Sequence, residues 1–83
     1  MQKLTYKTQG TCSQYILITL DDEGIVQGVQ FIGGCDGNTK GICSLVKGMK
    51  AADVKERLKG IKCGKKLTSC PDQLATALEQ MGY

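Results

Sequence analysis

The chain has 83 residues, of which 41% are hydrophobic and 23% charged, and its formal net charge is +3. This composition is typical of a folded globular domain and argues against a disordered chain. We expect a single domain over residues 1–83. The N-terminus lacks the apolar run of a signal peptide, and no segment approaches the roughly 20 apolar residues of a membrane span, so we expect a cytoplasmic protein without a membrane partner.

Lys3 to Thr8 alternates polar and apolar residues, which predicts a half-buried strand. A second strand is expected over Gln14 to Leu20, which is rich in β-branched and aromatic residues, and a third over Ile25 to Ile32. Asp21 to Gly24 separates the last two as a turn. Short connections of this kind predict an antiparallel three-stranded meander, which needs a cover over its apolar face.

After the third strand the apolar period changes from two residues to that of a helix. One helix is predicted on the spacing Ile42, Leu45, Val46 and Met49, capped by Asn38 or Thr39 and stopped by Gly48. A second, shorter helix carries Val54, Leu58 and Ile61, starts from the Lys50 to Asp53 region and closes near Gly60. A third covers Pro71 to Met81. Strands followed by helices predict an α+β fold, with about three helices packed on one face of the sheet.

The sequence contains five cysteines and no histidine. In a reducing compartment an odd set of cysteines indicates metal binding or redox chemistry rather than a disulfide framework. Without histidine a metal site must use thiolates, and soft sulfur ligands select zinc, copper(I) or iron–sulfur clusters. The missing histidine also removes the usual base of Ser–His or Cys–His catalysis, so we expect no catalytic residues of that kind.

Nucleic acids and nucleotides are not expected partners. The lysine-rich stretch between residues 55 and 66 is explained by a solvated helix face and the loop after it, and the chain has only three tyrosines and one phenylalanine for stacking on bases. The glycines between Gly33 and Gly41 lack the G-K-[ST] ending of a P-loop and the G-x-G-x-x-G spacing of a dinucleotide site.

The last predicted helix begins next to a cysteine. Proline is favoured at the first helical position and disfavours helical geometry in the residue before it, which predicts that Cys70 is the N-cap before Pro71. Asp72 then falls in the first turn, where an acidic side chain suits the positive end of the helix dipole. That end also favours the thiolate form of cysteine, which is the form that binds metal.

Four cysteines, Cys12, Cys35, Cys63 and Cys70, fall in loops or at the ends of predicted elements. Four thiolates can close a tetrahedral zinc site, which contributes directly to the folding of a small domain. The spacing alone leaves ordinary buried cysteines equally open, because no C-x-x-C pair is present. Cys43 lies inside a predicted helix beside its apolar stripe, and we expect it to be a small core residue.

These cysteines occur in blocks that resemble the TSCPD domain family, which is named for the motif at residues 68–72. The matching pieces are Gly10 to Cys12, Gly33 to Cys35, Leu45 to Met49, Gly60 to Cys63 and Thr68 to Asp72. In that family the domain also occurs at the C-terminal end of adenosylcobalamin-dependent ribonucleotide reductases, where its cysteines are thought to hold a metal.

The resemblance implies that Cys12, Cys35, Cys63 and Cys70 are metal ligands, with zinc the expected metal. It also implies an accessory role toward ribonucleotide reductase or a related protein partner. Reductase activity itself is not expected, because 83 residues cannot contain the catalytic barrel.

Two alternatives stay open. The same thiolates would suit an iron–sulfur cluster or sulfur carrier, since three strands followed by helices, with Gly-Gly-Cys after the third strand, are similar to NifU-like scaffolds. In that case Cys43 would be available as a fifth thiol for cluster exchange or persulfide chemistry. The other alternative is a thiol redox switch in which Cys63 pairs with Cys70.

Overall fold

The structure, a computed structural model, describes residues 1–10, 13–33, 36–62 and 68–83. Within these ranges the chain forms three strands followed by three helices, which confirms the predicted α+β class. They are β1 (Gln2–Lys7), β2 (Ser13–Leu20), β3 (Val26–Gly33), α1 (Asp36–Val46), α2 (Ala51–Leu58) and α3 (Cys70–Gln80). Each strand end lies within one residue of its predicted position.

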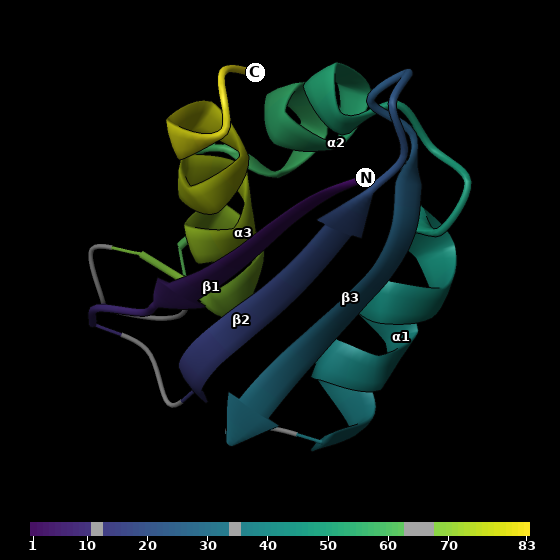
Figure 1. The fold of residues 1–83 in the computed structure, drawn as a ribbon. Coiled ribbons are helices and arrows are strands. Elements are labelled where there is room, and N and C mark those ends of the chain that lie inside the picture. The colour runs from purple at the N-terminus through teal and green to yellow at the C-terminus, as the bar shows by residue number, and fades with distance from the viewer. Residues whose placement is uncertain (11–12, 34–35, 63–67) are drawn as a thin grey trace.

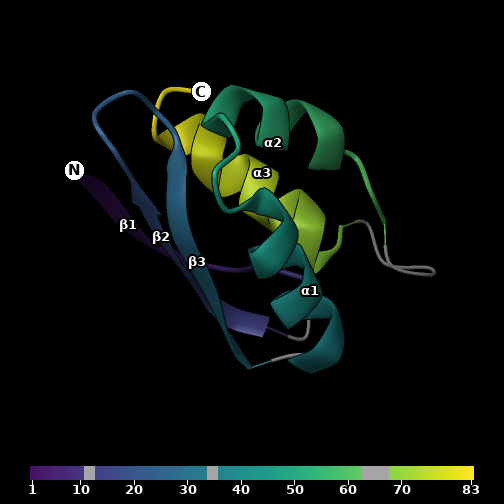
Figure 2. The ribbon, with the colours of Figure 1, turned by 90° about the vertical axis from the view of Figure 1, so that its right-hand side faces the viewer.

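The strands form an antiparallel sheet in the order β1-β2-β3, and the helices cover one of its faces (Figures 1 and 2). The central strand shows why this face is covered, because its alternate residues Ile16, Ile18 and Leu20 are at most 1% exposed. On the opposite face Tyr15 pairs in register with Ile32, and both side chains are exposed. The period-2 pattern therefore separates a core face from an open face.

The core lies between the sheet and the helices. α2 packs against α3, and α1 packs against β3. Each helix contributes apolar side chains that are at most 4% exposed, and they meet the inner residues of β2: Val46 from α1, Ala51 and Val54 from α2, and Leu74, Ala77 and Leu78 from α3. None of the helices in the described ranges is long and apolar enough to cross a membrane.

The first helix starts earlier than its pattern predicts. α1 begins at Asp36, ahead of the expected caps Asn38 and Thr39, and ends at Val46, before Gly48. The first turn carries no apolar residue, so the helical period becomes readable only at Ile42. Periodicity reports burial and therefore cannot detect a polar first turn.

The turn between β2 and β3 is fixed to the helices and to the C-terminus. Gly24 has φ of +80°, and a Cβ at this position would lie 3.0 Å from the ring of Tyr83. The carbonyl of Gly24 accepts a hydrogen bond from the backbone N–H of Ala51 at 2.8 Å. The Tyr83 hydroxyl in turn accepts one from the Gln2 side chain at 3.1 Å. Glycine is required here by both conformation and space.

Candidate metal centre

The start of α3 differs by one residue from the prediction. The N-cap is Ser69, whose φ and ψ of −147° and 170° are extended and whose hydroxyl accepts the backbone N–H of Asp72 at 3.1 Å. Cys70 is thus the first helical residue, followed by Pro71. The prediction that Cys70 is the N-cap was wrong because a hydroxyl oxygen is a better acceptor for a backbone N–H than a thiol sulfur is.

Of the four predicted ligands, the structure describes Cys70, which is half-buried at the start of α3. Cys12, Cys35 and Cys63 lie outside the described residues, so their roles as ligands, and the redox pairing of Cys63 with Cys70, stay predictions. In the part of the chain that is described, no three cysteine, aspartate or glutamate residues group closely enough to hold a metal ion. The structure does describe the residues that flank each cysteine, and these can be located.

The segments next to Cys12 and Cys35 lie side by side. Ser13, directly after Cys12, is paired with Gly33 at the end of β3, two residues before Cys35. This antiparallel pairing brings neighbouring backbones to within about 5.5 Å between Cα atoms. Sheet formation therefore joins the first two cysteine segments without any contribution from a metal.

The segment before Cys12 also meets the start of α3. Gly10 has φ of +74°, and a Cβ there would lie 3.1 Å from Cγ2 of Thr68. The backbone N–H of Gln9 donates a hydrogen bond to Oε1 of Gln73 at 3.0 Å. The chain that leads to Cys12 is thus held against the motif at residues 68–72 and its neighbour Gln73.

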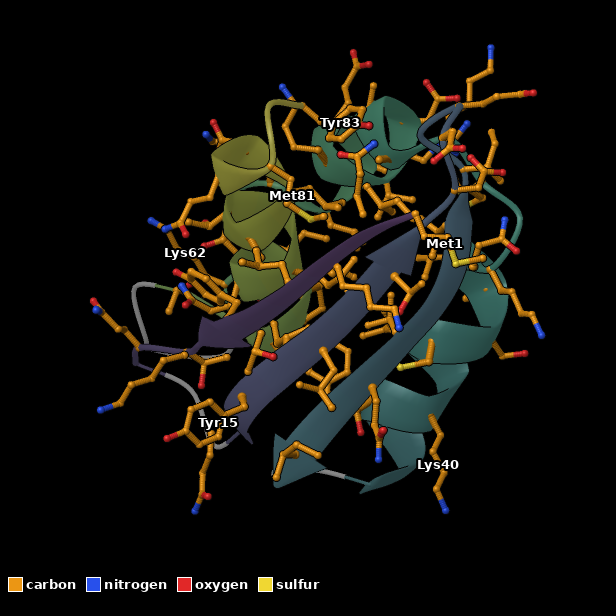
Figure 3. All side chains as sticks on the ribbon, in the orientation of Figure 1. Met1, Tyr15, Lys40, Lys62, Met81 and Tyr83 are labelled. Carbon is orange, nitrogen blue, oxygen red and sulfur yellow. The ribbon has the colours of Figure 1, made fainter. Side chains whose placement is uncertain are left out.

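The segment before Cys63 is held by the same motif. The backbone N–H of Gly60 donates to Oδ1 of Asp72 at 2.6 Å. The Ser69 hydroxyl donates to the carbonyl of Ile61. Lys62 projects beside α3, as Figure 3 shows.

Taken together, these neighbours form a series: Gly33 pairs with Ser13, Gly10 lies so near Thr68 that a Cβ would crowd it, and Ser69 bonds Ile61. The C-terminal ends of β1 and β3 and the N-terminal ends of β2 and α3 all lie in the lower left part of Figure 1. Tyr15 marks this end of the sheet in Figure 3. Residues that flank all four predicted ligands therefore gather in one region.

Three polar side chains connect these contacts, and we call Thr68, Asp72 and Gln73 the α3 clasp. The Thr68 hydroxyl donates to Oδ2 of Asp72 and accepts from Nε2 of Gln73, the latter at 3.0 Å. The sequence placed Asp72 in the first turn of the helix. The available signal was Ser69-x-x-Asp72, a pattern close to a capping box, but it does not reveal the partners that lie far away in sequence.

Cys43 takes part in none of the contacts described above. It is half-buried on α1 rather than part of the buried core that was predicted for it. It lines a cavity of about 240 Å³ between α1 and β3, together with Val29, Gln30, Phe31, Thr39 and Lys40. Burial raises the pKa of the Cys43 thiol above its ordinary value, while backbone hydrogen bonds from Phe31 and from Cys43 itself act in the opposite direction.

We expect Cys43 to ionise at higher pH in the folded protein than in the chain unfolded by urea. The protonated thiol thus favours the folded state below the ordinary thiol pKa, and this contribution is lost as the pH rises through the raised pKa. The rate of iodoacetamide labelling at Cys43, followed against pH by mass spectrometry, measures both midpoints. A folded-state midpoint at or below the one in urea would contradict the burial of this thiol.

The chain was compared with protein-family models, curated proteins and solved structures. The family model described as the TSCPD domain covers residues 2–82, which is nearly the whole chain. No curated protein and no solved structure is similar enough to match.

Proposed function

The chain belongs to the TSCPD domain family, and we propose that it is a small metal-binding module that holds zinc through Cys12, Cys35, Cys63 and Cys70. The observation that carries this proposal is the gathering of the flanking residues. Each proposed ligand is within two residues of a described position in that region: Ser13, Gly33, Ile61 and Ser69. Two residues of extended chain span at most about 7 Å, so each proposed ligand stays close to one of these positions.

The donor set also fits zinc. All four proposed ligands are sulfur, the sequence has no histidine, and structural zinc sites of four thiolates are tetrahedral. Bound zinc would cross-link the loops at this end of the sheet and add its binding free energy to folding. A domain of this size buries only about 60–65% of the surface of its unfolded chain, so a cross-link of this kind adds substantially to its stability.

We further propose that the module acts on or with a protein partner, such as an adenosylcobalamin-dependent ribonucleotide reductase. The support for this partner is the family resemblance, in which the same domain forms the C-terminal end of such enzymes. Co-elution of the purified chain with that reductase in size-exclusion chromatography tests the pairing. Separate elution at micromolar concentrations of both proteins would exclude a stable complex.

Metal analysis of protein purified without oxygen is the first experiment. We expect a colourless protein with one equivalent of zinc, and a melting temperature that falls on addition of a chelator. A ligand at 1,000 times its Kd stabilises the folded state by about 4 kcal/mol, so the fall is expected to be easily measured.

The same experiment separates the alternatives. A brown protein with visible absorption would support the iron–sulfur or sulfur carrier. A protein that carries no metal, and whose melting temperature does not respond to the chelator or to added zinc, would overturn the metal-binding proposal.

A further inference from the structure

We propose that Thr68, Asp72 and Gln73 are positioning residues of the thiolate site, which arrange the cysteine segments before the metal arrives and so raise the affinity for zinc. This inference rests on the proposed function, since it assumes that the four cysteines are the ligands. None of the three residues is a proposed ligand. Their role would be to fix the chain on either side of the ligands.

The α3 clasp links three segments that are far apart in sequence. Asp72 accepts a hydrogen bond from the backbone N–H of Gly60, in the segment before Cys63. Gln73 accepts a hydrogen bond from the backbone N–H of Gln9, which is 64 residues away and lies in the segment before Cys12. Thr68 lies between them and bonds both side chains, two residues before Cys70.

The bond between Gly60 and Asp72 is exposed, but burial makes the bonds of Gln73 difficult to exchange for bonds to water. Gln73 is only 7% exposed, although it is a polar residue on a helix that otherwise buries apolar side chains. Across the described residues, every buried side-chain nitrogen and oxygen has a hydrogen-bond partner. A buried amide that lost its partners would keep its desolvation cost, so the paired arrangement is strongly preferred.

The clasp bonds join protein groups to one another and need no metal. The segments before Cys12 and Cys63 are thus tied to the start of α3 in the metal-free protein. Ordering these segments in advance lowers the entropy lost when the metal binds. Outer residues that orient metal ligands typically change metal affinity 10–100-fold when they are replaced.

Thr68→Val tests this role, because valine keeps the shape of threonine and removes the hydroxyl that bonds both Asp72 and Gln73. We expect zinc affinity, measured by competition with a chelator, to fall about 10–100-fold. Thr68→Ser keeps the hydroxyl and is expected to recover most of that loss. Thr76→Val is the matched control, since the Thr76 hydroxyl donates to the carbonyl of Asp72 within α3 at 3.1 Å. We expect it to bind zinc as the wild type does.

Hydrogen exchange of the metal-free protein supplies a second readout. The amides of Gln9 and Gly60 are expected to exchange slowly in the wild type and in Thr76→Val. The Gln9 amide is expected to exchange faster in Gln73→Met, which removes its acceptor. A general loss of structure would instead speed exchange in β2 as well. If Thr68→Val does not fold, Asp72→Ala replaces it, because alanine has no side-chain acceptor for the Gly60 N–H or the Thr68 hydroxyl.

The outcomes separate this inference from the proposed function. Wild-type protein that binds zinc, with Thr68→Val (or Asp72→Ala in its place) binding it equally tightly, would overturn the positioning role and leave the metal site intact. Wild-type protein that binds no zinc would overturn both. Protected Gln9 and Gly60 amides, with weakened zinc binding in Thr68→Val and recovery in Thr68→Ser, would support the role.

Discussion

Leu74→Ala is expected to lower the free energy of unfolding by about 2–5 kcal/mol, the range for leucine-to-alanine changes in a close-packed core. Leu74 is fully buried in α3 and belongs to the cluster that includes Ile16 and Ile18 of the central strand. A domain of 83 residues has a total stability of about 4–12 kcal/mol, from about 0.05–0.15 kcal/mol per residue. This one substitution would therefore remove a large part of the stability.

Leu45→Ala is the matched control. The same substitution is made within a helix, at a side chain that is 77% exposed on α1. Leucine and alanine differ little in helix propensity, so we expect a change within about 0.5 kcal/mol. Urea denaturation of both variants, with a chelator present throughout, measures the difference. Equal losses in the two variants would contradict the burial described for them.

The strands could be predicted because burial alternates along them. Ile16, Ile18 and Leu20 face the helices, and the residues between them face outward, so the period of two is visible in sequence. The ends of the helices were harder to predict from the sequence. The first turn of α1 is polar and carries no burial signal, while α2 begins at Ala51 after Lys50, which makes no side-chain cap bond.

Cys43 shows a limit of the same method. It lies beside the apolar stripe of α1, and position on a helix face suggested a core residue. The helix instead packs at the edge strand β3, so a residue at the margin of the stripe faces an open cavity rather than the core. A helical period shows which face of the helix is buried, but it does not show how far the sheet beneath that face extends.

The motif at residues 68–72 could be recognised in sequence, but the hydrogen-bond partners of most of its residues could not be predicted. Ser69 rather than Cys70 caps α3, and Asp72 binds Gly60, which is 12 residues away. Gln73 lies just outside the motif and binds Gln9 across 64 residues. Such pairings depend on the packing of α3 against the rest of the fold, which no local pattern contains. The structure thus suggests why a motif centred on one cysteine would also include threonine, serine and aspartate.

Replacement of single cysteines is expected to give the largest change in metal content. Cys70→Ser removes one of four proposed ligands, and a serine hydroxyl is not deprotonated as a thiolate is near neutral pH. We expect bound zinc to fall from one equivalent to a small fraction after dialysis against a chelator. The apparent free energy of zinc binding to structural thiolate and imidazole sites is about 10–16 kcal/mol. The loss of one ligand can therefore lower the affinity by several orders of magnitude.

Cys43→Ser is the control for this change, because Cys43 is also a half-buried thiol within a helix but is not one of the proposed ligands. We expect it to keep one equivalent of zinc and to melt at a lower temperature when the chelator is added. Cys70→Ser should instead melt at the same temperature with and without the chelator, since the metal is already absent. Full zinc in Cys70→Ser would remove Cys70 from the ligand set. Loss of zinc in Cys43→Ser alone would indicate that the metal binds at the cavity between α1 and β3. The proximity of the four cysteine segments would then need another explanation.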